Sequence, residues 1–498
     1  MSLQIGRTNR RKFLERSVLG AGGVLLFSGL LESCTKHDSD IPAPVLGSDP
    51  PYSANFDWND DAKITVTSAI EMVPVAGDLL GGLVDIFWPD SKVDVWSQIK
   101  AQVEALVDQK IAAAVYLQVT EDLQGLNNTL ILYLDELKNG TQDDIRTQWL
   151  ISKNLFVNAL PHFQSAGNEL PLLPLFAQFA NLYLAILRDG AAFGVSWGRS
   201  AADHQQDVID LTQAIKSFWD YAANIYETGR IKPLQTKVDP HLCQPFKAVN
   251  AYDRQMALTV IDFMDTWDYF DVTLFPYGTT YVSNREIFSD PMGTCDDSGN
   301  IVMATPPPTK RPTNLTVWAY DRIDAVQLTY PAGSGPGGVT KTNRMGDAGG
   351  GTSNVLTLTP DNQIIAARAT YGDIVNQLQF VFDDGTTTPT YGNIAGSNDS
   401  KMIGYYSEIL SSIHINGVSS FYGSADCVVF GFQFAQSTAA TLAAIQALYI
   451  KTPHERTAAD FANAFPKLGI TTALITYELK AARKTYWEKL KAHAAAIR

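Results

Sequence analysis

The sequence is poor in the residues that bind metals and build disulfide frameworks. Its 498 residues include four cysteines and seven histidines. Cys243, Cys295 and Cys427 match no zinc-binding spacing, and the histidines are scattered without an H-E-x-x-H pairing. We therefore expect no metal, no cofactor and no catalytic residues. A disulfide between Cys243 and Cys295 and free buried thiols are both open alternatives.

Basic charge is also scarce. There are 38 Lys and Arg residues against 52 Asp and Glu, which gives a formal net charge of −14. A protein that binds nucleic acid neutralises phosphates with a basic surface. This balance therefore argues against a nucleic-acid partner.

One long internal segment lacks charge altogether. Between Glu169 and Arg188 no side chain is charged, and apolar residues cover nearly every direction of a helix. A helix that is apolar all round is buried in a large core or placed in a membrane, and this one approaches the roughly 17–25 residues that span a bilayer. The residues that suit either role are Leu172, Leu173, Phe176, Phe179, Leu182, Tyr183, Ile186 and Leu187.

Residues 1–34 are predicted to be an export signal. Arg10 and Arg11 precede an apolar run, which is typical of twin-arginine export in bacteria. The residues leading to Cys34 resemble a lipobox in which Glu32 is atypical. We expect Cys34 to be lipidated, so that the exported protein is anchored to the bacterial envelope or cell surface, or is later released. Residues 35–58 have the composition of a linker.

Helical patterns fill residues 59–290. The predicted helices cover residues 64–88, broken near Pro74 and Gly77, then 93–118, 120–139, 141–163, 170–195 and 247–267, with one more beginning after Ser200. Thr141 and Asp144 have the spacing of a capping box, as do Ser200 and Asp203. Because amphipathic helices flank the apolar one in sequence, we expect it at the centre of a bundle.

The sequence pattern changes from helical to that of β-strands over residues 291–434. The predicted strands are 316–330, 355–358, 364–371, 376–383 and 427–434, separated by turn signals such as Asn416-Gly417 and a Gly-rich stretch at 333–351. Residues 435–498 return to a helical, Ala-rich pattern that ends in a basic amphipathic helix. The predicted fold is therefore multidomain, α followed by β, with a short C-terminal helical segment.

Two segments match the sequence pattern of a catalytic or binding motif but lack the secondary structure that the motif requires. Gly194-Val-Ser196-Trp-Gly198 fits a nucleophile elbow, but an elbow needs a strand before it, and here a long helix precedes. A helix-terminating turn is the favoured interpretation. The G-x-G-x-x-G at 333–338 has no helix after it, so we predict a loop between strands.

The apolar helix and its predecessor form a candidate hairpin over residues 141–195. The second half of the preceding helix is apolar except for Asn158 and His162. Such a hairpin can pass through a bilayer because every backbone group stays bonded inside its own helix. The alternative is a core helix of a soluble domain.

The helical part resembles the first domain of the three-domain insecticidal delta-endotoxins, the crystal (Cry) toxins of spore-forming bacilli. The similar segments are residues 73–86, 96–111, 172–198, 256–262 and 285–291. The resemblance implies a seven-helix bundle whose fourth and fifth helices, 141–163 and 170–195 here, insert to form a pore. The family commonly carries a histidine where this chain has Tyr183, so the role of that imidazole does not transfer.

Residues 310–434 resemble a β-prism of the kind found in the second toxin domain and in jacalin-like lectins, through segments 320–330, 378–382 and 424–432. By analogy Gly423, Ser424 and Asp426 are candidate sugar contacts, and a prism without a sugar site is the alternative. We expect the third toxin domain to be absent.

Together the resemblances imply a non-enzymatic, pore-forming toxin-like protein. Its prism would bind a glycan or glycoprotein receptor, and the hairpin would then enter the lipid of a target membrane, where a homo-oligomer would form. The alternative is a lipid-anchored surface glycan-binding protein or adhesin in which the bundle serves as a structural scaffold.

Overall fold

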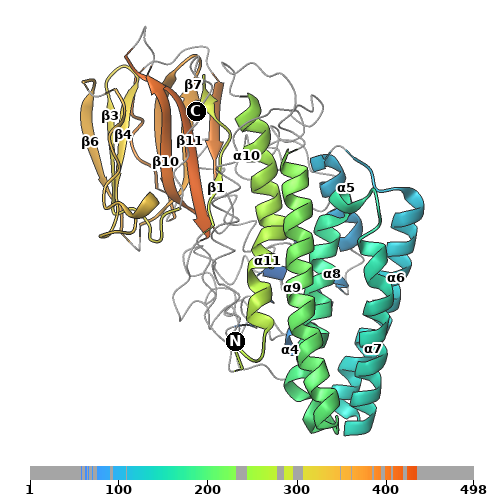
Figure 1. Cartoon of the computed structure of the whole chain (residues 1–498). Coiled ribbons are helices and arrows are strands. Elements are labelled where there is room, and N and C mark those ends of the chain that lie inside the picture. The colour runs from blue at the N-terminus through green and yellow to red at the C-terminus, as the bar shows by residue number, and fades with distance from the viewer. Residues whose placement is uncertain are drawn as a thin grey trace, which may run out of the picture.

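The computed structural model of the chain shows a helical bundle beside a β domain (Figure 1). It describes Trp58, Ala62, Lys63, Thr65, Val66 and Ile70, and residues 76–89, 94–107, 109–231, 244–276, 285–294, 307–347, 349–359, 362–383, 386–393, 399–404, 408–418 and 423–434. The predicted export signal, most of the linker and the C-terminal segment lie outside these residues.

Within the described residues, the bundle consists of seven helices. They are α4 (Asp78–Phe87), α5 (Val95–Val107), α6 (Ala113–Asn139), α7 (Gln142–Phe163), α8 (Glu169–Phe193), α9 (Ala201–Ile231) and a last, interrupted helix. That last helix runs as α10 (Gln244–Met256), the π-helical turn η4 (Ala257–Ile261) and α11 (Asp262–Trp267), followed by the short η5 (Asp268–Phe270). The predicted seven-helix bundle with a central apolar helix is confirmed.

Two helix predictions were wrong in detail. α5 ends at Val107 and α6 begins at Ala113, so the break between them does not fall near Thr120. Thr120 lies inside α6, where its hydroxyl donates to the Tyr116 carbonyl oxygen (2.8 Å) one turn back. The last helix was predicted to be continuous, but a π-helical turn interrupts it. That turn places Ala257 in the hydrophobic core of the β domain and Val260 in the core of the bundle.

The described part of the β domain contains three antiparallel sheets. The first holds β1 (Ile287–Phe288), β11 (Ala425–Phe434) and β10 (Glu408–Val418) in that order, with β2 (Met292–Gly293) also paired to β11. The second has the order β5 (Met345–Gly346), β4 (Ile323–Thr329), β3 (Asn314–Ala319) and β6 (Thr352–Thr357). The third has the order β8 (Val375–Phe382), β7 (Ile364–Tyr371) and β9 (Asp399–Ile403). The inward faces of the sheets share one hydrophobic core.

Two of the β-domain predictions were wrong, and the sequence analysis did not predict β1, β2, β5, β9 or β10. The run 316–330 is two strands, β3 and β4, because the chain reverses at Tyr320, whose N–H donates to the Arg322 carbonyl oxygen (3.2 Å). Asn416-Gly417 is not a turn, since both residues lie inside β10 and Asn416 pairs with Cys427. The strand pairing with β11 overrides the local turn preference of Asn-Gly.

Buried ion pairs join the two domains. Asp262 of α11 accepts hydrogen bonds from Arg285 Nε (2.6 Å) and from Lys63 Nζ (3.0 Å), and Arg285 also reaches Glu408 on β10. Arg254 of α10 donates to the Phe288 carbonyl oxygen (2.6 Å) on β1. These contacts hold the end of the bundle against the first sheet.

Candidate membrane-inserting hairpin

The helix α7 is closed at both ends by local signals. Thr141 is its N-cap, and the reciprocal hydrogen bonds with Asp144 form the predicted capping box. Pro161 lies in its last turn, and Gly167 in the following loop has a φ of 79°, a conformation that glycine adopts without strain. The chain therefore reverses within a few residues, and α7 and α8 form a helical hairpin.

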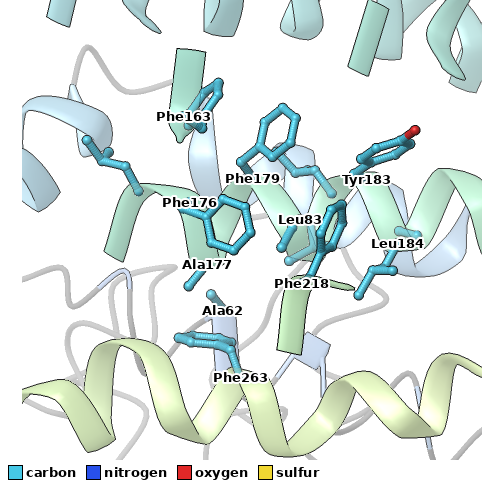
Figure 2. Close-up of a cluster of buried hydrophobic side chains, with 14 of the residues drawn as sticks. Ala62, Leu83, Phe163, Phe176, Ala177, Phe179, Tyr183, Leu184, Phe218 and Phe263 are labelled. Atoms are coloured by element: carbon cyan, nitrogen blue, oxygen red, sulfur yellow. The ribbon is translucent and has the colours of Figure 1, made fainter. Parts of the chain in front are cut away.

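The helix α8 is buried on every side. From Pro171 to Ala191 each residue is buried, and the predicted apolar residues of this helix all lie in the bundle core. Figure 2 shows Phe176, Phe179 and Tyr183 among side chains from the surrounding helices, including Phe163, Phe218 and Phe263. Among the described residues, one helical segment, Glu169–Trp197, has the length and hydropathy to cross a membrane.

Several polar atoms within α8 have hydrogen-bond partners inside the bundle, whereas Gln178 Nε2 has none among the described residues. Asn181 donates to Gln178 Oε1 (3.0 Å) and accepts from Trp267 Nε1 (2.8 Å). Trp149 of α7 donates from its Nε1 to the Ile186 carbonyl oxygen (2.8 Å). Burial without such partners would cost roughly 1–3 kcal/mol for each group, so the apolar helix is accommodated in the soluble bundle by specific contacts.

Aromatic rings hold α7 to α8. Phe156 stacks on Tyr183 with centroids 5.1 Å apart, and Phe163 stacks on Phe179 at 4.3 Å. At the other end Gly190 lies so close to Trp149 that a Cβ there would be 2.0 Å from the indole. The absence of a side chain at Gly190 therefore lets the two helices approach closely.

The sequence of each domain matches a family model. Residues 64–271 match the delta endotoxin N-terminal domain, and residues 290–429 match the jacalin-like lectin domain. The chain therefore joins a delta-endotoxin N-terminal domain to a jacalin-like lectin domain.

Curated relatives match the endotoxin domain. Pesticidal crystal protein Cry8Ba of Bacillus thuringiensis serovar kumamotoensis is 31% identical over 235 residues, which are 45% of this chain and 20% of that protein. Pesticidal crystal protein Cry1Ia of Bacillus thuringiensis subsp. kurstaki is 30% identical over 240 residues, which are 47% of this chain and 32% of that protein. The chain thus spans about a fifth to a third of the length of the curated relatives that it matches.

Solved structures share the two-domain fold. The insecticidal crystal protein Cry7Ca1 of Bacillus thuringiensis superposes with a TM-score of 0.64 at 20% identity, over 77% of this chain and 76% of that chain. PirB superposes with a TM-score of 0.60 at 14% identity, over 77% of this chain and 98% of that chain. At these identities the likeness establishes the fold.

Ion pairs tie the hairpin of the endotoxin domain to its neighbour α9. Lys153 of α7 lies 3.2 Å from Asp207 Oδ1 and 2.6 Å from Asp210 Oδ2. Arg199 binds Asp207 through two hydrogen bonds, at 2.8 and 3.0 Å. Lys153 and Arg199 also lie over the Trp149 ring. The sequence analysis did not predict this network, although the acidic residues at Asp203, Asp207 and Asp210 mark one face of α9 at helical spacing.

The candidate sugar contacts of the jacalin-like domain lie at the start of β11. Gly423 has a φ of 61° and is partly exposed, whereas Ser424 and Asp426 are 0% and 4% exposed. The Ser424 hydroxyl has no hydrogen-bond partner within the described part of the chain. The structure therefore brings these three residues together but keeps two of their side chains below the surface.

Other predicted residues have simpler outcomes. Ser196 lies in the short helix η1 (Gly194–Trp197), and its hydroxyl donates to the Phe193 carbonyl oxygen (2.6 Å), so the predicted helix-terminating turn is confirmed. Cys427 is a buried free thiol whose pKa is raised to about 12 by burial. Arg10, Arg11, Cys34, Cys243 and Cys295 lie outside the described residues.

Proposed function

We propose that this protein acts on membranes by inserting the hairpin of α7 and α8, after its jacalin-like domain has bound a receptor or glycan. The observation that carries the proposal is the nature of α8. It is apolar on every face and buried in the soluble fold, and it is paired to a neighbour by aromatic stacking. Such a helix keeps its apolar surface out of water in either environment.

The dimensions of α8 suit a bilayer. Its uncharged stretch from Leu170 to Leu187 would be about 27 Å long at 1.5 Å per residue, close to the ~30 Å hydrocarbon core. Glu169 stands at one end of this stretch, and Arg188 and Asp189 stand at the other. Charges at both ends and none between them are compatible with a spanning orientation, in which the ends reach the two polar surfaces.

Insertion would separate the hairpin from Trp267, and this bears on oligomerisation. Asn181 would lose the indole N–H that satisfies it in the bundle. In hydrocarbon an amide side chain is stabilised by hydrogen bonds to a neighbouring helix. We therefore expect inserted copies to associate through Gln178 and Asn181, which gives a physical reason for a homo-oligomer in the membrane.

We also propose that the loop before β11 contacts a sugar. The buried Ser424 hydroxyl, which has no partner within the described part of the chain, would gain one from a sugar hydroxyl. At the neighbouring Gly423, the one atom near an added Cβ would be Asp347 Oδ2, at 3.9 Å. Asp426→Ala should abolish binding on a glycan array, with Asp383→Ala, at a different loop, as the control. Equal binding by the wild type and both variants would remove the sugar contact from this loop.

The sequence also supports export and lipidation. Arg10, Arg11 and Cys34 are the residues on which this depends. Metabolic labelling with a radiolabelled fatty acid should mark the wild-type protein and not Cys34→Ser. Labelling of both proteins, or of neither, would contradict lipidation at Cys34.

Membrane insertion is tested by dye release from liposomes. The protein is assayed with and without proteolytic removal of the linker and first helices, across lipid compositions and pH values. Release of dye is the expected result. The absence of release under every condition would contradict insertion, and glycan binding without release would favour the adhesin with a structural bundle.

A cross-link shows whether the hairpin itself must move. Lys153→Cys and Asp210→Cys place two thiols across the contact between α7 and α9, in a chain whose Cys34, Cys243 and Cys295 are changed to serine. A cleavable bis-maleimide should block dye release until the link is cut. The same reagent joining Ser165→Cys to Asn168→Cys closes only the hairpin's own loop and should leave release intact. Release by the protein cross-linked between α7 and α9 would contradict the mechanism.

A further inference from the structure

Two consecutive charged residues end the apolar stretch of α8, and both are buried. Arg188 is 3% exposed and Asp189 is 6% exposed. Arg188 Nη1 donates to the carbonyl oxygens of Tyr269 (3.2 Å) and Phe270 (3.4 Å), at the C-terminal end of the last helix. A cation is favourable at a helix C-terminus. The guanidinium therefore bonds to these carbonyl oxygens, and the Asp189 carboxylate makes its hydrogen bonds elsewhere.

Asp189 joins three helices through one oxygen. Its Oδ2 accepts hydrogen bonds from the Gly77 backbone N–H (3.0 Å) and from the Tyr133 hydroxyl (3.0 Å). Gly77 is the N-cap of α4, and its φ of 85° turns its N–H toward the carboxyl group. Tyr133 belongs to α6 and is fully buried. The carboxyl group thus fixes α4 and α6 to the central helix.

The charges around Asp189 leave its ionised form poorly compensated. The titratable and charged groups that face it are Asp78 on α4, Tyr133 on α6 and Arg188 on α8 itself. Burial disfavours a carboxylate, and Asp78 adds repulsion, while the two hydrogen-bond donors and Arg188 offset only part of this. Burial therefore raises the pKa of Asp189 to about 7.

We infer that Asp189 is a proton-controlled latch between the central helix and α4, firm when its carboxyl group is protonated and weakened when that group ionises. The latch rests on the proposed function for its consequence, since α4 must leave α8 before the hairpin can move. In the opened state water reaches the carboxyl group, whose pKa returns to its ordinary value of 3.8. The stabilisation is then fully present below about pH 4 and is lost as the pH rises to about 7.

Hydrogen exchange of the α4 amides, residues 78–87, tests the latch. One proton released on opening corresponds to a tenfold rise in the opening constant for each pH unit. We expect the protection factors of wild-type α4 to fall by up to about tenfold per pH unit between pH 4 and 7, in excess of the fall seen for Asp189→Asn. The amide introduced by that substitution keeps an acceptor oxygen for Gly77 and Tyr133 but cannot ionise. Equal slopes in the two proteins would overturn the latch.

A control variant and a substitute variant accompany this test. Asp135→Asn removes an exposed carboxyl group of α6 and should leave the wild-type slope unchanged. If Asp189→Asn does not fold, Tyr133→Phe takes its place. It removes a donor that favours the ionised carboxylate, so the pH at which protection is lost should move upward. An unchanged midpoint in Tyr133→Phe would overturn the latch.

Dye release at pH 5 and pH 7.5 is measured on the same samples to separate the latch from pore formation. Exchange slopes that differ between wild type and Asp189→Asn support the latch even if no dye is released, in which case only the insertion mechanism fails. Dye release accompanied by equal exchange slopes supports insertion and overturns the latch. If the latch operates and the protein inserts, the exchange slopes of the two proteins differ and dye is released. Asp189→Asn then releases dye more slowly than the wild type at pH 7.5.

Discussion

Lys153→Met tests whether separation of α7 from α9 limits insertion. The Lys153 side chain is 15% exposed, and its ammonium group contacts two carboxylates of α9. Methionine keeps much of the side chain's apolar stem but removes the charge. The partner carboxylate of Asp207, which is 1% exposed, keeps its two hydrogen bonds from Arg199 and is not left alone.

The size of the stability change in Lys153→Met depends on the Arg199–Asp207 pair that remains. Removing one partner of a buried pair costs about 3–5 kcal/mol when the other charge is left without a partner. A charged hydrogen bond is worth roughly 1.5–3 kcal/mol, and here Arg199 continues to compensate Asp207. We therefore expect Lys153→Met to lower the free energy of unfolding by about 1–2 kcal/mol. If the same contacts break before insertion, dye release should accelerate by about 5- to 30-fold.

Two controls separate this effect from general destabilisation. Lys216→Met removes the partner of Asp220 in an exposed pair within α9 itself. It should change the free energy of unfolding by no more than about 0.5 kcal/mol and leave the rate of release unchanged. Gly190→Ala forces a Cβ against Trp149 inside the hairpin and should cost about 1–3 kcal/mol without speeding release. Urea midpoints and release rates are measured together. Loss of stability in Lys153→Met without faster release would refute the reasoning, as would equal acceleration by Gly190→Ala.

Three further outcomes are expected. Trp267→Phe leaves the Asn181 amide oxygen buried without its donor. It should lower the free energy of unfolding by about 1–3 kcal/mol, which the urea midpoint measures. Trp58→Phe is the control without this hydrogen-bond cost, because the Trp58 indole N–H has no partner among the described residues. Asp262 is buried, which alone would raise its pKa, but the charges of Arg285 and Lys63 outweigh the burial and lower that pKa to about 2. Roughly 2 kcal/mol of the free energy of unfolding is therefore lost as the pH falls from about 4 through 2. Asp262→Asn should flatten that acid limb of the stability curve, and an unchanged limb would contradict the assignment. Gly77→Ala, at a φ of 85°, should increase hydrogen exchange in α4 while leaving exchange in β11 unchanged.

The sequence was sufficient to predict the central helix and its hairpin. An uncharged run of helical length has few stable placements, and the capping box at Thr141 sets the start of α7 by purely local hydrogen bonds. The break after α5 could not be predicted in the same way. It depends on side-chain contacts to the backbone between the helices. Glu104 Oε1 accepts from the Ile111 N–H, and Asn168 Oδ1, which is distant in sequence, accepts from the Ala112 N–H.

The polar network of the hairpin could be predicted only in part. The spacing of Asp203, Asp207 and Asp210 shows an acidic face on α9, but which cation meets it depends on how the helices pack. Likewise β10 was not predicted, because its adjacent Ser411 and Ser412 and its Asn-Gly pair resemble a loop until β11 supplies a partner strand. Tertiary contacts decide both cases.

Polar contacts, and not the apolar core, should set the balance between the soluble and inserted states of the hairpin. The apolar side chains of α8 are out of water in the bundle and would remain so in hydrocarbon, where lipid tails replace helix neighbours with little change in hydrophobic energy. Their burial therefore largely cancels between the two states. The hydrogen bonds and ion pairs of Lys153, Asn181, Arg188 and Asp189 exist in the bundle and must be broken or replaced on insertion. Shortening an apolar side chain such as Leu184 should then lower soluble stability strongly yet change the release rate less than Lys153→Met does.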